Sequence, residues 1–321
     1  MSFTVLMTAP KLAPKGVKKL SEAGCRVIYV DNPKDPDAVY RILSTEPVDA
    51  VISRTLDLTG EAIRACPTLK VITKHGVGVS NIDVDAATQR NIPVLVTPGT
   101  NSQSVAELAL GLMLAAARRI ALYDRDLRAG NWSRSGDGQQ LSGRTLGLVG
   151  FGQIGQTLAT FCMAIGMKVV AYDPMMKQSP VEGVTLIDEL PELLRQSQVL
   201  SLHCPLLPST KNLIDEQALS LLPDGAILVN TARGPLIDES AMVAALQSGK
   251  LAGAGLDTFV NEPLSASDAI ASMPTVVMTP HVGGSTPDAL EAMAAHAADN
   301  VLRFLNGEPL APTLCVNHLI K

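Results

Sequence analysis

The sequence has few cysteines, no dense run of basic residues and no long apolar stretch, and each absence excludes a class of protein. Its five cysteines form no CxxC pair and no cysteine–histidine spacing suited to zinc, so we expect no metal site. Scattered cysteines in odd number are typical of a reducing compartment, which predicts a cytoplasmic protein. The net charge of −5, with no Lys/Arg-rich run, argues against a nucleic-acid partner.

The longest apolar run, residues 108–117, is far shorter than the roughly 20 residues that span a bilayer. The first residues also lack the uninterrupted apolar stretch of a signal peptide. We therefore expect no membrane partner and interpret residues 108–117 as a buried helix, one that also suits the interface of a homodimer. The length of 321 residues favours two domains.

Short β-branched runs alternate with segments of helical length along the whole chain. The first series of predicted strands is 3–8, 27–30, 50–53, 71–73 and 94–97. The second series is 145–149, 168–172, 199–203, 227–230, 253–258 and 276–279. Continuous rather than alternating apolar runs indicate strands buried on both faces, so the predicted fold class is α/β with doubly wound parallel sheets.

Two predicted helices are longer than the rest and divide the chain. The first follows polar residues that end at Ser104, with Glu107 three positions later in a capping-box pattern. The second begins after Thr286 and ends near Leu305. If these helices connect two domains, residues 1–100 and 286–321 form one discontinuous, smaller domain, and residues 101–285 form a second, continuous domain.

A G-x-G-x-x-G pattern directly follows the predicted strand 145–149 and opens a helix. Gly150 allows a tight turn, Gly152 lets the backbone approach a pyrophosphate, and Gly155 lets helix and strand pack closely. The next strand ends at Asp173, whose carboxylate can accept both ribose hydroxyls and repel a 2′-phosphate. These residues predict an NAD site, although Lys177 lies near enough in sequence to weaken that repulsion.

Six further motifs surround this fingerprint. They occupy residues 74–83, 97–107, 202–206, 230–234, 256–263 and 279–284. Together they resemble, over essentially the whole chain, the D-isomer-specific 2-hydroxyacid dehydrogenase family. Within it the motifs are most similar to 3-phosphoglycerate dehydrogenase-like members without a regulatory extension. The resemblance implies an NAD-dependent dehydrogenase acting on a small D-2-hydroxy acid or 2-oxo acid, with 3-phosphoglycerate as one candidate. It implies that residues 101–285 are a Rossmann domain that binds NAD, and that residues 1–100 and 286–321 are a smaller, flavodoxin-like substrate domain.

The resemblance also implies that Arg233, Glu262 and His281 are the catalytic residues. These residue types suit the reaction, because arginine binds a carboxylate through two parallel hydrogen bonds and keeps its charge. Histidine titrates near neutral pH and can therefore exchange the proton of the reacting oxygen. A neighbouring carboxylate holds the imidazole in one orientation.

The remaining implied positions bind substrate or cofactor. Those expected to bind substrate are Val77, Gly78, Asn101, Arg54, Lys74 and His75. Those expected to bind the cofactor, besides the three glycines and Asp173, are Gln153, Ile154, Cys204, Pro205, Thr231, Ala232, Asp257 and Gly284. For several of them a structural role is the alternative: Asn101 as a helix cap, Asp257 as a loop acid and Cys204 as a packing residue.

The chain departs from the family pattern at Lys74-His75, where many relatives carry arginine and a small residue. Arg54 and Lys74 are candidates for binding a second anionic group of the substrate, or else are solvated loop charges. A glyoxylate/hydroxypyruvate reductase is therefore the alternative enzyme. From another class, the chain also resembles C-terminal binding proteins, which are NAD-sensing scaffolds. Trp132 matches a family position near a subunit interface.

Overall fold

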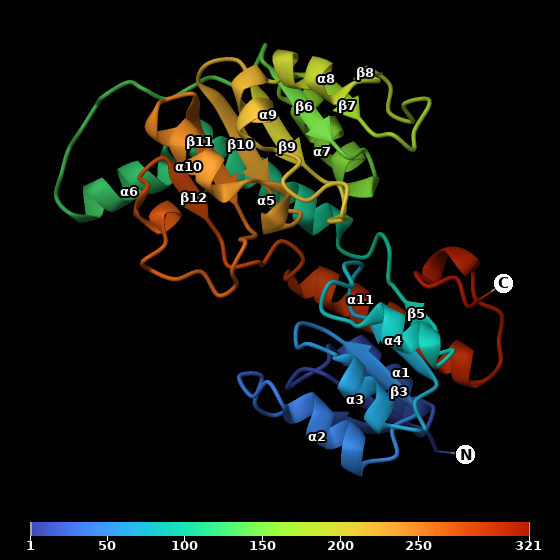
Figure 1. Ribbon diagram of the computed structural model, residues 1–321. Coiled ribbons are helices and arrows are strands. Elements are labelled where there is room, and N and C mark those ends of the chain that lie inside the picture. Colours follow the sequence, from blue (N-terminus) through green and yellow to red (C-terminus); the bar gives the residue numbers. More distant parts are fainter. Residues whose placement is uncertain (1, 321) are drawn as a thin grey trace. The chain divides into compact units, whose positions relative to one another are not determined.

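The computed structural model describes residues 2–320, which belong to two compact units (Figure 1). Unit 1 is assigned Met1–Asn101 and Gly284–Lys321, and unit 2 is assigned Ser102–Gly283. Each unit has one sheet flanked by helices, and all pairings between the strands of these sheets are parallel. The predicted α/β class with doubly wound parallel sheets is confirmed.

Unit 1 has a sheet with the strand order β2-β1-β3-β4-β5. Its strands are β1 (Thr4–Met7), β2 (Arg26–Tyr29), β3 (Ala50–Ser53), β4 (Val71–Lys74) and β5 (Val94–Leu95). Its helices are α1 (Pro14–Glu22), α2 (Ala38–Thr45), α3 (Gly60–Ala65), α4 (Val84–Gln89) and α11 (Pro287–Leu305), with a short 3-10 turn η3 (Pro312–Leu314). Helix α11 follows unit 2 in sequence and packs against α1 and β4, so unit 1 is discontinuous.

Both faces of the unit 1 sheet are buried, because successive strand residues point to opposite sides. Leu6 and Val51 pack into the cluster that contains apolar residues of α2, α3 and α4. Met7 and Ile52 pack into the cluster that contains residues of α1 and α11. This two-sided burial explains why the strands are continuous apolar runs in the sequence.

Unit 2 has a sheet with the strand order β12-β11-β10-β9-β6-β7-β8. Its strands are β6 (Thr145–Val149), β7 (Lys168–Tyr172), β8 (Val184–Leu186), β9 (Val199–Leu202), β10 (Ala226–Asn230), β11 (Leu251–Leu256) and β12 (Val276–Met278). Its helices are α5 (Ser102–Ala117), α6 (Ile120–Arg128), α7 (Gln153–Ala164), α8 (Leu190–Gln196), α9 (Glu216–Leu221) and α10 (Glu239–Gln247), with 3-10 turns η1 (Gly234–Leu236) and η2 (Ala269–Ser272). The apolar clusters on its two faces contain α5 and α7 on one side and α8, α9 and α10 on the other.

The strand order of unit 2 reverses between β6 and β9. From β6 the chain proceeds to β7 and β8 on one side, and from β9 to β12 on the other. In an open parallel sheet, ligands bind outside the carboxyl ends of the strands at such a reversal. The carboxyl ends of β6 and β9 lead directly into Gly150 and His203.

The structure differs from the sequence predictions at three places. Helix α5 already begins at Ser102, so Ser104 lies inside it and does not cap it; the carboxylate of Glu107 instead accepts a hydrogen bond from Gln103 Nε2 at 2.7 Å. Strand β8 was not predicted, because a strand of three residues at a sheet edge leaves no apolar run in the sequence. The strand predicted at 253–258 is β11, which begins and ends two residues earlier.

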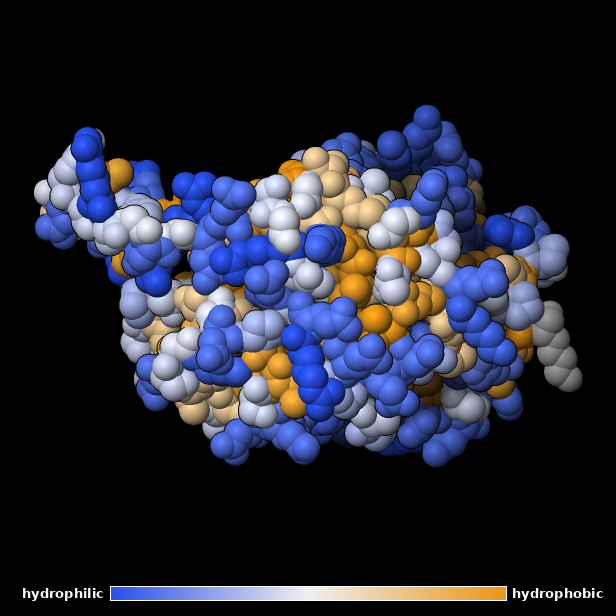
Figure 2. Space-filling view, turned by 90° about the horizontal axis from the view of Figure 1, so that it is seen from above, coloured by the Kyte–Doolittle hydropathy of each residue, from blue (hydrophilic) through white to orange (hydrophobic). Residues whose placement is uncertain are grey.

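The apolar helix α5 is explained by burial within its own unit. It packs against α7, β10 and β11, and the backbone of β11 approaches it so closely that a Cβ on Gly255 would lie 2.8 Å from Leu112 Cβ. In contrast, none of the residues of α6 is buried. Figures 1 and 2 show α6 and the segment after it extending away from the body of unit 2.

Helix α11 begins where the sequence predicted. Thr286 caps it by accepting the backbone N–H of Ala289 at 3.2 Å, and Pro287 occupies its first turn. Within residues 2–320 no helix combines the length and apolar character needed to cross a membrane. The same residues include no group of three His, Cys, Asp or Glu side chains placed to hold a metal ion.

Candidate active site

His281 and Glu262 form an ion-pair contact in unit 2. The Nδ1 atom of His281 lies 2.8 Å from Glu262 Oε2, and Glu262 Oε1 accepts the backbone N–H of Phe259 at 3.0 Å. A carboxylate accepts only, so this contact assigns the proton of the neutral ring to Nδ1 and leaves Nε2 for another partner. The imidazole is 47% exposed and is therefore accessible to a ligand.

The carboxylate of Glu262 is held in its ionised form. Burial by itself would raise its pKa, but the hydrogen bonds from His281 and from the Phe259 N–H outweigh burial. The positive charges of His281 and Arg233 act in the same direction, so the pKa of Glu262 is lowered. The glutamate can thus hold the imidazole in one orientation.

Arg233 follows strand β10, and its charge interacts with that of Glu262. Burial lowers the pKa of its guanidinium and the charge of Glu262 opposes that shift, but an arginine remains charged at neutral pH. Asn230, buried at the end of β10, fixes the turn: its Nδ2 donates to Arg233 O at 2.8 Å and its Oδ1 accepts the N–H of Ala232 at 3.0 Å.

Gly234 lets the turn after β10 touch the turn after β11. A Cβ at this position would lie 2.0 Å from the carbonyl carbon of Phe259, so no other residue fits without moving the backbone. This contact brings Arg233 and Glu262, which are far apart in sequence, onto adjacent turns. The family resemblance assigned each residue a role but could not show that they converge.

Asp257 organises the turn that carries His281. Its carboxylate accepts the N–H of Val282 and of Gly283, both at 2.8 Å, and the hydroxyl of Thr279 at 2.6 Å. The backbone carbonyl of Asp257 accepts the His281 N–H at 2.9 Å. His281 has φ of 53°, a left-handed conformation that needs such support in a residue other than glycine. Sequence reasoning offered a cofactor role or a simple loop acid for Asp257 and missed this structural role.

The glycine loop after β6 requires glycine at two of the three positions of its G-x-G-x-x-G pattern. Gly150 has φ of 90°, and a Cβ on it would lie 2.6 Å from Cys204 N, whereas a Cβ on Gly155 would lie 2.7 Å from Gly150 O. A Cβ on Gly152 would meet no protein atom within 4 Å, which leaves that side of the loop open to a ligand. Helix α7 begins at the next residue, Gln153, and directs its N-terminus toward the loop.

Asp173, at the end of β7, contacts the glycine loop directly. Its Oδ2 accepts the N–H of Phe151 at 2.8 Å, and its Oδ1 accepts the N–H of Met175 at 3.0 Å. The carboxylate therefore stands beside the glycine loop. Of the neighbouring positions, Gln153 accepts the Ser102 hydroxyl through Oε1 at 3.3 Å, and Ile154 packs with the α5–α7 cluster.

The other expected cofactor residues lie at three places in the chain. Cys204 and Pro205 follow β9 at the switch point, and burial raises the pKa of the Cys204 thiol to about 11, which supports packing rather than reactivity. Thr231 and Ala232 follow β10, and the buried Thr231 Oγ1 has no hydrogen-bond partner among the described residues. Such an orphaned hydroxyl suits a bound cofactor. Gly284 is assigned to unit 1, where a Cβ on it would lie 2.8 Å from Asn101 Nδ2.

The expected substrate loop lies in unit 1. Gly76 has φ of 128° and is tied to Thr97, whose N–H donates to Gly76 O at 2.9 Å and whose Oγ1 accepts the Gly76 N–H at 3.0 Å. Of the next two residues, Val77 is exposed and Gly78 is half-buried. Their backbone is therefore accessible on a loop whose base is fixed.

Lys74 has an internal role that the sequence did not reveal. Its ammonium donates to the carbonyl of Arg54 and to Asn81 Oδ1, and Asn81 Nδ2 donates to Leu56 O at 2.7 Å. Lys74 and Asn81 thus join the loop after β3 to the loop after β4. Burial and the charge of Arg54 lower the pKa of His75 to about 4, so this imidazole is neutral at physiological pH.

Comparison with known proteins identifies the family. The model of the D-isomer specific 2-hydroxyacid dehydrogenase NAD binding domain matches residues 110–283. D-3-phosphoglycerate dehydrogenase of Mycobacterium tuberculosis is 40% identical over 313 residues, which are 96% of this chain and 58% of that protein. Hydroxypyruvate reductase of Thermotoga maritima is 38% identical over 303 residues, 87% of this chain and 98% of that protein.

Solved structures of other proteins have a similar fold. The TT0316 protein from Thermus thermophilus has a TM-score of 0.87 at 37% identity, covering 98% of this chain and 100% of that one. NAD-dependent formate dehydrogenase from Staphylococcus aureus in complex with NAD has a TM-score of 0.87 at 29% identity, covering 98% and 99%. The chain spans 58% of the length of the mycobacterial relatives.

These matches and the geometry of unit 2 define a dinucleotide-binding α/β protein. The chain belongs to the D-isomer specific 2-hydroxyacid dehydrogenase family, as its motifs indicated. The expected NAD-type cofactor is confirmed by the matched domain and by related structures that hold NAD or NADP.

Proposed function

We propose that this protein is an NAD-dependent oxidoreductase that interconverts a small 2-oxo acid and the corresponding D-2-hydroxy acid. The observation that carries this proposal is the contact between His281 Nδ1 and Glu262 Oε2, in the same unit and on turns adjacent to that of Arg233. An acid–base pair beside a guanidinium, at the carboxyl end of a nucleotide-binding sheet, suits carbonyl reduction.

Each of the three side chains has one task. Arg233 binds the substrate carboxylate and polarises the neighbouring carbonyl group. His281 donates a proton from Nε2 to the carbonyl oxygen during reduction and accepts it during oxidation, while Glu262 keeps the ring oriented. A bound nicotinamide cofactor would supply the hydride for reduction at C2 and would accept it in oxidation. The substrate thus gains one hydride and one proton, and His281 regains its proton from water.

The glycine loop and Asp173 would hold the dinucleotide, and Thr231 supplies a hydroxyl beside it. We propose a preference for NAD over NADP, because a carboxylate at the end of β7 repels a 2′-phosphate. Among the described residues Lys177 forms no ion pair with Asp173, which supports the preference.

For the substrate, we propose a D-2-hydroxy acid or 2-oxo acid with a second anionic group bound by Arg54. The phosphorylated hydroxy acid 3-phosphoglycerate is one example. In support, the guanidinium of Arg54 makes no ion pair within residues 2–320. Lys74, tied to its neighbours, supplies positive charge rather than a movable ligand. The alternative is a glyoxylate or hydroxypyruvate reductase, since the relatives of this name match over nearly their full length.

We also propose a cytoplasmic homodimer. All five cysteines are free thiols, which suits a reducing compartment. Helix α6 and the segment after it expose Ile120, Leu127 and Trp132, of which Trp132 is 76% exposed. A second copy of the chain is the partner that would cover these side chains.

The test is an NADH-oxidation assay over a panel of 2-oxo acids, with and without a phosphate or a second carboxylate, repeated with NADPH. His281→Ala should lower kcat on the best substrate about 100-fold or more, while NADH binding stays within about twofold of wild type. His318→Ala is the matched control, since His318 also has positive φ but belongs to unit 1. Full activity in His281→Ala would remove the proposed mechanism, and NADH binding without turnover of any 2-oxo acid would favour a scaffold.

A further inference from the structure

Two loops of unit 1 leave its sheet side by side, and one amide side chain joins them. The loop after β3 begins at Arg54, and the loop after β4 contains Val77 and Gly78. Strands β3 and β4 pair in parallel, so both loops start at the same carboxyl edge of the sheet, where ligands of parallel sheets bind. Both loops carry residues that the family resemblance assigns to the substrate.

Asn81 closes the loop after β4 and ties it to the loop after β3. Its Oδ1 accepts a hydrogen bond from the ammonium of Lys74, at the other end of the same loop. Its Nδ2 donates to Leu56 O at 2.7 Å, to Ser53 Oγ at 3.1 Å and, more weakly, to Arg54 O at 3.4 Å. This half-buried amide therefore fixes the two loops relative to each other.

The backbone of Arg54 is held at both its N–H and its carbonyl. The N–H donates to the hydroxyl of Thr8 at 2.8 Å, and Thr8 is fully buried. The carbonyl accepts hydrogen bonds from Lys74 Nζ and Asn81 Nδ2. Among the described residues, the Arg54 guanidinium forms no ion pair. A charge on a fixed backbone binds an anion with little further loss of conformational entropy.

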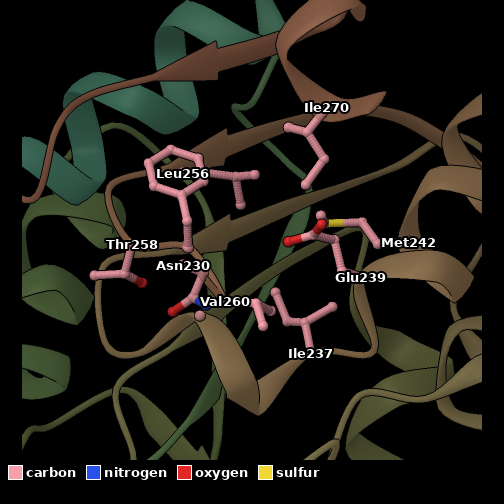
Figure 3. A pocket seen from close by; sticks show the side chains of 10 residues that line it. Asn230, Ile237, Glu239, Met242, Leu256, Thr258, Val260 and Ile270 are labelled. Atoms are coloured by element: carbon pink, nitrogen blue, oxygen red, sulfur yellow. The ribbon is translucent and has the colours of Figure 1, made fainter. Parts of the chain in front are cut away.

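A similar arrangement occurs in unit 2. Asn230, which lines the small cavity in Figure 3, donates through Nδ2 to Arg233 O at 2.8 Å. Each arginine proposed to bind substrate thus follows a parallel strand and has its carbonyl bonded to an asparagine amide. Asn230 precedes its arginine by 3 residues, whereas Asn81 follows Arg54 by 27, so no local pattern in the sequence reveals the second pair.

We infer that Asn81 is a positioning residue that determines substrate specificity: with Lys74 it holds the backbone of Arg54 so that the guanidinium meets the second anionic group of the substrate. Asn81 acts through Arg54 and is not itself a ligand. The inference rests on the proposed function, since it assigns Asn81 to the anion contact of that reaction.

The test is a mutant cycle of Asn81→Ala and Arg54→Ala, with steady-state kinetics on 3-phosphohydroxypyruvate and on hydroxypyruvate, which lacks the phosphate. Asn81→Ala alone should raise KM for the phosphorylated substrate about tenfold, with kcat and the KM for hydroxypyruvate changed less than about threefold. In the Arg54→Ala background the same substitution should change KM less than about twofold, because no guanidinium is left to position.

Asn317→Ala is the matched control. Asn317 is also half-buried in unit 1, and its side chain also joins two segments: Oδ1 accepts the Val94 N–H at 3.0 Å, and Nδ2 donates to Ile92 O at 2.9 Å. The control loses a comparable set of hydrogen bonds away from Arg54, so it should change neither KM.

The inference is overturned if Asn81→Ala raises KM for 3-phosphohydroxypyruvate equally in both backgrounds, if Asn317→Ala raises it as much, or if Arg54→Ala leaves it unchanged. If wild type reduces no 2-oxo acid, the proposed function fails and hydrogen exchange tests the positioning alone. Amides of residues 54–58 should then exchange about tenfold faster in Asn81→Ala than in wild type or Asn317→Ala, and equal rates overturn the inference. Should Asn81→Ala fail to fold, Asn81→Asp, which loses only the Nδ2 donor, provides the same comparisons.

Discussion

His281 Nδ1 lies 2.8 Å from Glu262 Oε2, although the two residues come from different turns after different strands. The contact uses one carboxylate oxygen of Glu262, and the other is held by the backbone of Phe259. An imidazole held from one side by a fixed carboxylate presents its second nitrogen in one direction only.

Glu262→Gln should be less stable than wild type at neutral pH, and the difference should vanish in acid. Folding lowers the pKa of Glu262 below its ordinary value of 4.5, so the folded state binds this proton less tightly than the unfolded state. The contribution of the Glu262 carboxylate to stability is complete above pH 4.5, and it is lost as the pH falls through the lower pKa that this group has in the folded state. The side chain is 38% exposed, so solvent screening limits the effect to under about 1 kcal/mol, or roughly 1–3 °C in Tm.

Calorimetry of both proteins at pH 7, 5, 4 and 3 measures this difference. If the difference in Tm between wild type and Glu262→Gln grew toward pH 3, the pKa of Glu262 would be raised by folding rather than lowered. The same variant should lose about 10- to 100-fold in kcat, because a neutral amide holds the Nδ1–H group of His281 less firmly than a carboxylate does.

Asp257→Ala should destabilise the protein by about 2–4 kcal/mol, because it leaves two backbone N–H groups and the Thr279 hydroxyl without their acceptor. Activity should fall about 100-fold as His281 loses its backbone support. Urea unfolding and kcat measure the two effects. Asp215→Ala, which removes the cap of α9, is the control and should cost about 1 kcal/mol with no loss of kcat. Equal effects of both variants would contradict the role of Asp257.

Gly150→Ala and Gly152→Ala should separate folding from cofactor binding. The first places a Cβ at positive φ and against the backbone after β9, so it should destabilise the protein by about 2–4 kcal/mol. In Gly152→Ala the added Cβ meets no protein atom within 4 Å, so the Tm of this variant should stay within about 1 °C of wild type. Its methyl group stands where a pyrophosphate must approach, and the Kd of NADH should rise about tenfold or more. Unchanged NADH binding in Gly152→Ala would place the dinucleotide elsewhere.

Arg54→Ala should discriminate between the two substrate proposals. Loss of a guanidinium–anion contact should lower kcat/KM for phosphorylated 2-oxo acids about 10- to 100-fold, with glyoxylate nearly unaffected. The ratio of the two kcat/KM values is the measurement. Arg64→Ala, an exposed arginine at the end of α3, is the control. A ratio that does not change would favour a glyoxylate or hydroxypyruvate reductase.

A double variant, Leu127→Glu with Trp132→Ala, should convert the proposed dimer into a monomer. Both side chains are more than half exposed on the segment that extends from unit 2 (Figure 2). Light scattering after size exclusion should give twice the chain mass of 33.7 kDa for wild type and about that mass for the variant. Met175→Ala, with a 91% exposed side chain elsewhere, should leave the mass unchanged. A monomeric wild type would contradict the proposal.

Much of the fold could be predicted because it depends on local patterns. Strands β3, β6 and β7 have the predicted bounds, since buried parallel strands are continuous apolar runs between turn residues. Helix α11 begins at Pro287 after its threonine cap for an equally local reason. The edge strand β8 and the start of α5 were not predicted correctly, because tertiary packing decides them more than sequence pattern does.

Part of the candidate site could likewise be predicted from the sequence, and part could not. Gly150, Gly152 and Gly155 are recognisable in sequence because backbone geometry demands glycine at fixed spacing. The resemblance supplied Arg233, Glu262 and His281, but their spacing carried no geometric signal. The partners Asn81 for Lys74 and Val282 for Asp257 were missed, because hydrogen bonds between loops depend on how separate strands end at one edge of a sheet.

By itself the sequence determined the α/β class, the glycine loop and the family, because periodicity, glycine spacing and motif order are properties of the chain alone. Only the tertiary structure decided that the turns after β10 and β11 touch at Gly234 and that Asp257 holds His281 in a left-handed conformation. The physical reason is that these contacts join residues far apart along the chain. Their distance is set by the packing of the sheet and not by any local preference of the residues themselves.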